Sequence, residues 1–182
     1  MDIAEIARGW VTVAAAFAYP FNEQTYATLR REAASFPPEV ACLLRAEEDV
    51  TDVRLAHQRM LVGPGPVRPS PWESVNRGEE GLVFDENTFE VREFYRRFGL
   101  QSSHLNRFPE DHVAIEAEFL AHLLALYLEQ DEERYLDGFR QFIAAHAGLW
   151  LPQYFADFYA ASATDYHRAI ALIGQRTVQA DV

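Results

Sequence analysis

Ionisable side chains gather in the segment 108–124, where one predicted helix begins. Asp111 and His112 are adjacent, and Glu116 and Glu118 follow on the next turn. A carboxylate in the first turn of a helix is stabilised as an anion by the helix dipole. A histidine four residues before a glutamate can pair with it across one turn. These residue types suit metal binding, acid–base catalysis or recognition of a positively charged ligand.

Spacing argues against the first two of these chemistries. The pairs His112/Glu116 and Glu118/His122 are each four residues apart, but they lie on different helix faces. Asp111 and His112 diverge by about 100°, so the aspartate does not orient the histidine as in a catalytic triad. No serine or cysteine lies in a nucleophile-elbow context, and no nucleotide-binding motif occurs. We therefore predict no catalytic residue, metal or cofactor, with a metal-dependent hydrolase as the less favoured alternative.

The composition narrows the class of partner. The 182 residues include 28 acidic and 16 basic ones, all of the latter arginine, for a net charge of −12. Such a balance argues against nucleic acid or an anionic membrane surface and favours a cationic partner. No apolar run approaches the length of a membrane span, and no signal peptide is recognised, so we expect a cytoplasmic protein with no direct membrane insertion. The single cysteine, Cys42, lies in an apolar run and is interpreted as a core residue.

Helical spacing of apolar residues covers most of the chain. No stretch alternates with period two, so we predict an all-α bundle of about eight to nine helices forming a single domain over residues 1–182. Asn22 and Thr164 are expected to cap helices, and Gly99 to end one in a left-handed conformation. The expected helices cover residues 3–17, 22–36, 40–46, 51–62, 88–98, 111–124, 132–147, 152–161 and 164–173, with a helix break near Gly148.

One long loop, residues 63–87, interrupts this pattern with four prolines and four glycines. A loop of this length inside a compact domain is often functional. Within it, Ser70 fits the N-cap of a short helix, Pro71 its first position and Glu73 the third position of a capping box. This turn presents Trp72 either toward a ligand or as a plug against the body of the bundle.

The order and spacing of several short motifs resemble the TorD/DmsD family of chaperones for molybdenum-containing oxidoreductases. The motifs are Gly63-Pro64-Gly65, Pro71-Trp72-Glu73-Ser74-Val75, Val91-Arg92-Glu93-Phe94-Tyr95, Gly99-Leu100, Pro109-Glu110-Asp111-His112 and Glu116-Ala117-Glu118-Phe119-Leu120. The resemblance is densest over residues 60–124. It extends weakly to His146, Trp150, Pro152 and Phe155.

The resemblance implies a cytoplasmic chaperone rather than an enzyme. Family members bind the twin-arginine signal peptide, or the N-terminal segment, of a molybdenum-cofactor oxidoreductase and hold it back from export until the cofactor is loaded. An assembly factor that grips the folded enzyme is the alternative. Some members exchange helices between protomers, which would make the linker 99–108 a hinge for a homodimer. The family's recognition surface corresponds here to Pro71, Trp72, Glu73, Ser74, Pro109, Asp111, His112 and Glu116.

The residues also support this function on physical grounds. A twin-arginine leader carries two guanidinium groups followed by an apolar stretch, so its partner needs carboxylates beside an aromatic surface. Asp111, Glu116 and Glu73 are the expected carboxylates, and Trp72 and Tyr95 the expected aromatic residues. We interpret Glu118 as a solvated charge. The hypothesis requires residues 72–73 to meet residues 111–112 in the fold, and predicts that Asp111→Ala or Trp72→Ala weakens peptide binding without unfolding the protein.

Overall fold

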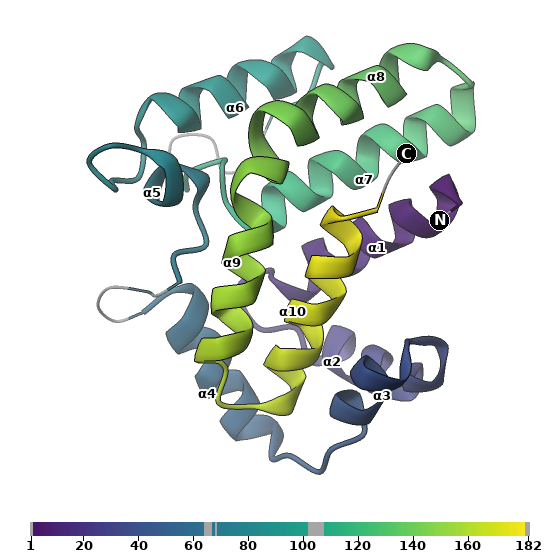
Figure 1. The fold of residues 1–182 in the computed structure, drawn as a ribbon, viewed down its shortest axis with the longest axis vertical. Coiled ribbons are helices and arrows are strands. Elements are labelled where there is room, and N and C mark those ends of the chain that lie inside the picture. Colours follow the sequence, from purple (N-terminus) through teal and green to yellow (C-terminus); the bar gives the residue numbers. More distant parts are fainter. Residues whose placement is uncertain (1, 64–66, 68, 102–107, 181–182) are drawn as a thin grey trace.

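The computed structural model describes residues 2–63, 67, 69–101 and 108–180, and these form an all-helical bundle (Figure 1). The helices are α1 (Ile3–Ala16), α2 (Glu23–Arg31), α3 (Pro38–Leu44), α4 (Val50–Leu61), α5 (Glu73–Arg77), α6 (Glu86–Arg97), α7 (Val113–Gln130), α8 (Glu133–Phe142), α9 (Gly148–Ala161) and α10 (Asp165–Val178). No β-strand occurs within these ranges, which confirms the predicted fold class. In the same residues, no helix combines the length and apolar character required to span a membrane.

Local sequence signals explain where several helices begin and end. The Asn22 side chain accepts hydrogen bonds from the backbone of α2, and the Thr164 hydroxyl accepts one from His167 N, so both predicted N-caps are confirmed. Gly99 has a φ of 72°, and the N–H of Leu100 donates to the carbonyl of Tyr95 at 3.1 Å. This arrangement ends α6 in the predicted left-handed turn.

The centre of the bundle is formed by α1, which packs along α7 and also contacts α10 (Figure 1). Trp10 and Phe17 of α1 are fully buried. The ring of Phe17 contacts Phe155 and Phe158 of α9 at centroid distances of 5.4 and 5.0 Å. Aromatic burial of this kind stabilises the bundle through apolar area and ring contacts. These ring contacts hold the C-terminal end of α1 against α9.

The predicted helix break near Gly148 is wrong. A π-helical turn, Ile143–Ala147, joins α8 directly to α9, and the chain changes direction there (Figure 1). A Cβ on Gly148 would lie 2.6 Å from the carbonyl oxygen of Ile143, so glycine permits this close approach. Pro152 is then accommodated inside α9, where burial of Tyr154 and Phe155 offsets the hydrogen bond that proline removes.

Two other local expectations also fail. Cys42 is exposed, because α3 buries Val40, Ala41 and Leu44 on its opposite face. Ser70 is not a helix cap. Helix α5 begins at Glu73, so its N-cap residue is Trp72, and the Trp72 side chain makes no capping hydrogen bond. The capping box predicted for this turn therefore does not form. The prolines and glycine of the motif at 64–66, and most of the linker 99–108, lie outside the described residues.

Candidate functional site

The two motifs expected to meet do so at the start of α7. Residues 71–74 cross residues 109–113, and we call this contact the junction. The N–H of Glu73 donates to the carbonyl of Asp111, and the N–H of Val113 donates to the carbonyl of Pro71, both at 2.9 Å. These bonds flank an isolated antiparallel bridge between Trp72 and His112. The predicted proximity of the two motifs is therefore confirmed.

Asp111 caps α5 from a distant part of the chain. Its carboxylate accepts hydrogen bonds from the N–H of Ser74 at 2.7 Å and from the Thr88 hydroxyl at 2.9 Å. The side chain is fully buried, and burial raises its pKa above the ordinary value despite these bonds. Asp111 also precedes the N-cap of α7, so its expected place in the first turn of that helix is wrong. The buried carboxylate of Asp111 therefore links the segment before α7 to Ser74 and Thr88.

His112 is the N-cap of α7 and is held in the neutral form. Its Nδ1 accepts a hydrogen bond from the N–H of Ala114 at 3.2 Å, so the proton of the neutral ring lies on Nε2. Burial lowers the pKa of the imidazole to about 3. Nε2 is itself buried and has no hydrogen-bond partner among the described residues. The expected alternative, a local pair with Glu116, does not form.

Glu73 ties α5 to the π-helical turn. Its carboxylate is fully buried, pairs with Arg77 one turn along α5, and lies 3.2 Å from Nδ1 of His146. Arg77 also donates to the carbonyl of Ala145 at 3.0 Å. A charge buried in this way is retained only when it is paired and hydrogen-bonded. The junction thus extends to the point where α8 turns into α9.

Glu116 is fully buried and lies near Glu73 in the interior of the bundle. The indole N–H of Trp150 donates to its carboxyl group at 3.1 Å. Burial, and then the neighbouring Glu73 carboxylate, raise the pKa of Glu116 well above its ordinary value. The raised pKa favours the protonated form of Glu116, whose carboxyl group lies between Glu73 and Trp150. This is a structural arrangement that helical spacing alone does not reveal, because its partners are far away in the sequence.

The other predicted site residues are also part of the interior. Tyr95 is buried, and its hydroxyl donates to the carbonyl of Glu110 at 3.1 Å. Pro71, Ser74 and Pro109 are buried as well. Of the nine predicted site residues, Trp72 alone keeps partial exposure. The junction therefore presents the indole of Trp72, while its carboxylates hold the backbone in place. Their predicted role in binding a peptide stays a prediction.

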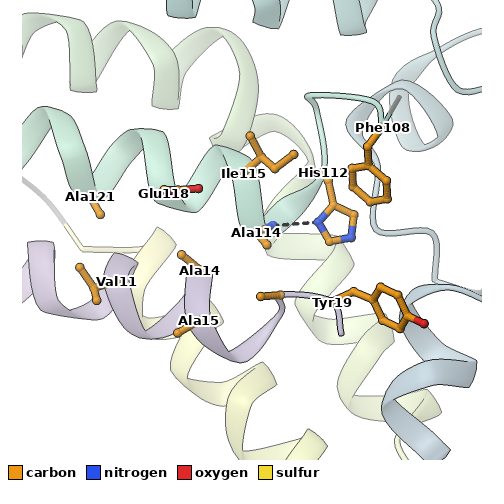
Figure 2. A pocket seen from close by; sticks show the side chains of 11 residues that line it. Val11, Ala14, Ala15, Tyr19, Phe108, His112, Ala114, Ile115, Glu118 and Ala121 are labelled. Carbon is orange, nitrogen blue, oxygen red and sulfur yellow. Dashed lines mark hydrogen bonds between the residues drawn. The ribbon is translucent and has the colours of Figure 1, made fainter. Parts of the chain in front are cut away.

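An apolar groove of about 610 Å³ opens beside the junction, between α1 and α7 (Figure 2). Its walls are small apolar residues from both helices, its rim carries Tyr19 and Phe108, and His112 closes one end. The ring of Trp72 contacts Phe108 and His112 at centroid distances of 5.9 and 5.5 Å. The residues that line the groove are Val11, Ala14, Ala15, Ala18, Tyr19, Phe108, His112, Ala114, Ile115, Glu118 and Ala121.

The α1 wall of this groove was not anticipated from the sequence. Val11, Ala14 and Ala15 recur at positions i, i+3 and i+4 of α1, which places them on one helix face, and Ala18 follows two residues after the helix ends. The core face of the same helix carries Trp10 and Phe17 instead. The sequence signal for this wall was a second row of apolar residues on the helix, beside the row that forms the core.

Within the described residues, no group of three or more histidine, cysteine, aspartate or glutamate side chains is arranged to hold a metal ion.

Comparison with known proteins gives the family context. The family model described as nitrate reductase delta subunit matches residues 21–156. The Tat proofreading chaperone DmsD of Salmonella typhi is 26% identical over 123 residues, which cover 68% of this chain and 57% of that protein. The selenate reductase assembly chaperone protein of Thauera selenatis is 30% identical over 136 residues, covering 66% of this chain and 68% of the relative. The chaperone protein TorD of Vibrio parahaemolyticus is 28% identical over 88 residues, covering 46% of this chain and 41% of that protein.

The fold is also shared with a solved structure. A putative redox enzyme maturation protein from Archaeoglobus fulgidus superimposes with a TM-score of 0.63, at 18% identity, over 99% of this chain and 95% of that one. The alignment to the DmsD relatives spans a little over half of their length. The family model, in contrast, matches well over half of the present chain. The chain therefore belongs to the nitrate reductase delta subunit family, the group of redox-enzyme maturation chaperones that includes TorD and DmsD.

Proposed function

We propose that this protein is a cytoplasmic, non-catalytic chaperone that binds the twin-arginine signal peptide, or the N-terminal segment, of a molybdenum-cofactor oxidoreductase. It would hold this precursor back from export until the cofactor is loaded. Family membership supports the proposal, as does the similarity to the DmsD relatives, which are Tat proofreading chaperones. The chain would act as a single domain and carry no metal or cofactor of its own.

The observation that carries the proposal is the placement of the junction at the end of an apolar groove. A twin-arginine leader continues into an apolar stretch, and a groove of about 610 Å³ with small-residue walls lies within the size range of binding pockets. The indole of Trp72 lies against Phe108 and His112, both of which line this groove. The net charge of −12 speeds the encounter with an arginine-rich segment.

We propose that the nine residues act together around this groove. Trp72, which is half-buried, contacts the leader. The other eight residues lie buried beneath Trp72 and fix the shape of the surface; they are Pro71, Glu73, Ser74, Tyr95, Pro109, Asp111, His112 and Glu116. Because Asp111 is buried and caps α5, Asp111→Ala removes a structural contact, and Trp72→Ala is the cleaner test of binding.

Titration of the labelled leader peptide into the full chain tests the proposal by fluorescence anisotropy. We expect a Kd on the order of micromolar that rises with ionic strength, because the arginines interact with a screened negative field. Trp72→Ala should raise the Kd about tenfold, because aromatic residues dominate many binding surfaces. Leu128→Ala, which removes an exposed apolar side chain at the far end of α7, is the control and should leave the Kd unchanged. Absence of leader binding to the wild-type protein contradicts the proposal.

The alternative is an assembly factor that grips the folded enzyme. The similarity to the selenate reductase assembly chaperone protein of Thauera selenatis supports this alternative. Co-purification with the oxidoreductase whose leader has been deleted separates the two functions: a leader-binding chaperone loses the complex, and an assembly factor retains it. A homodimer formed by helix exchange is part of the proposal, and sedimentation would detect it as twice the 20.8 kDa mass of one chain.

A further inference from the structure

The α1/α7 groove combines apolar walls with two polar groups at separate positions. Ala14 and Ala15 of α1, with Ala18 just beyond the end of that helix, form one wall, and the α7 wall includes Ala114 and Ala121 (Figure 2). Small side chains on both walls leave room for the larger side chains of an occupant. The apolar surface that such an occupant would bury is the main source of binding free energy in a site of this kind.

His112 contributes an unsatisfied donor at one end of the groove. Because Nδ1 accepts from the N–H of Ala114, the neutral imidazole carries its proton on Nε2. In Figure 2 this second nitrogen lies on the side of the ring away from Ala114. It is buried and unpartnered among the described residues, while the whole side chain is 2% exposed. A buried donor without an acceptor costs free energy, so a ligand that supplies a carbonyl oxygen relieves that cost.

Glu118 contributes a carboxylate farther along the same wall. It lines the groove, is exposed, and forms no ion pair with any described residue. It lies six positions after His112 in the chain, which corresponds to about 9 Å along a helix. An extended peptide covers this distance in about three residues. The spacing therefore suits a positively charged side chain that lies about three residues from an accepting carbonyl.

We propose that the groove binds the apolar stretch of the leader in an extended conformation, with one main-chain carbonyl accepting a hydrogen bond from His112 Nε2 and the preceding arginine pairing with Glu118. This inference rests on the proposed function, and it assigns a main-chain carbonyl and an arginine of the leader to His112 and Glu118. An extended chain is favoured over a helix because a carbonyl inside a helix is already used by its own hydrogen bonds. A peptide that lacks either the arginine or the apolar residues should bind this site more weakly.

Two matched pairs of variants test the assignment in the full chain with the labelled leader peptide. Ala14→Phe fills the groove from α1, and Ala27→Phe adds the same ring to an exposed position of α2 as its control. We expect a loss of affinity of about tenfold for the first and none for the second. Thermal unfolding of both variants verifies that the added ring leaves the bundle folded.

The second pair tests the charge. Glu118→Gln removes the groove carboxylate, whereas Glu129→Gln removes an exposed carboxylate from the end of the same helix with the same change in net charge. We expect about a threefold loss of affinity and a weaker salt dependence for Glu118→Gln alone, which is the range of an exposed ion pair. Unlike a general effect of net charge, this loss should disappear when the arginines of the peptide are replaced by glutamine.

Nitrogen-15 NMR of the histidine side chains provides a readout that does not depend on affinity. The free protein should show His112 protonated on Nε2, and the leader should shift this Nε2–H resonance as the carbonyl accepts its hydrogen bond. If the leader binds the wild type but binds Ala14→Phe and Glu118→Gln as tightly as their controls, the groove assignment is overturned and the proposed function stands. If the wild type binds no leader, both fall.

Discussion

The junction and the α1/α7 groove lie side by side, yet their carboxyl groups lie in opposite environments. The junction buries four carboxyl groups (Glu73, Glu110, Asp111 and Glu116), and each has at least one hydrogen-bond partner, although Oε1 of Glu110 and Oε1 of Glu116 have none among the described residues. The groove is open, lined by alanines, and its polar groups, His112 Nε2 and Glu118, lack partners in the described part of the chain. This difference indicates that the motif residues stabilise the fold, whereas the neighbouring small residues leave space for a ligand.

The largest expected effect comes from removing the central carboxylate of the junction. Asp111→Ala leaves the N–H of Ser74 and the hydroxyl of Thr88 without their acceptor, so we expect the free energy of unfolding to fall by about 3 kcal/mol. Urea denaturation measures this loss. Asp111→Asn keeps one oxygen for Ser74 and should cost less, while Asp137→Ala, at an exposed position, should stay within about 0.5 kcal/mol of the wild type. Equal losses for Asp111→Ala and Asp137→Ala would show that the junction is not a structural element.

A smaller loss is expected on the side of the π-helical turn. Arg77→Ala removes the ion-pair partner of the buried Glu73 and the donor to Ala145, and we expect it to lower the free energy of unfolding by about 2 kcal/mol. The exposed pair between Arg31 and Glu32 supplies the control, because Arg31→Ala should cost little. Hydrogen exchange should also increase at residues 143–147 in the Arg77 variant. Unchanged exchange there contradicts the link between α5 and this turn.

Glu116 should make stability depend on pH. Its pKa in the folded protein is raised above the ordinary value of 4.5, so both states hold the proton below pH 4.5. Above that pH the unfolded chain releases its proton while the folded protein keeps it, and the wild type loses about 1.4 kcal/mol per pH unit until the raised pKa is reached. Glu116→Gln retains the acceptor for Trp150 and has no proton to release, so its stability should increasingly exceed that of the wild type as pH rises. Parallel pH profiles for the two proteins contradict this assignment.

The smallest effect is expected in the groove. His112 has a pKa of about 3 because of its burial, so it stays neutral over the physiological range. The Kd for a leader peptide without histidine should therefore change by less than about twofold between pH 5.5 and 8. A steep change near pH 6.5 would instead show that a histidine with an ordinary pKa contributes to binding. This measurement separates the junction, which responds to pH through stability, from the groove, which does not respond through binding.

Much of the fold could be predicted because its signals are local. Asn22, Thr164 and Gly99 act on backbone groups within a few residues, so their effect on helix ends is readable from the sequence. The predicted break at Gly148 failed for the opposite reason. Whether a glycine and a nearby proline end a helix depends on the packing of α9 against α10, which local propensity does not contain.

The site was predicted in part. The meeting of Trp72 with His112 followed from the resemblance of the motifs and is present as a backbone bridge. The burial of Glu73 and Glu116 was not foreseen, because their partners His146 and Trp150 are 73 and 34 residues away in the chain. Glutamates at helical spacing are usually solvated, and only the surrounding side chains reveal that these are enclosed.

Residue types and local spacing were enough to predict most of the helices, the ends set by Asn22, Thr164 and Gly99, the net negative charge and the family. These depend on residue type and on spacing over a few positions, which a linear chain specifies directly. The tertiary structure alone decided that Asp111 caps α5 and that the alanine faces of α1 and α7 enclose a groove. Both follow from which elements pack together, and that outcome depends on burial across the whole bundle rather than on any single segment.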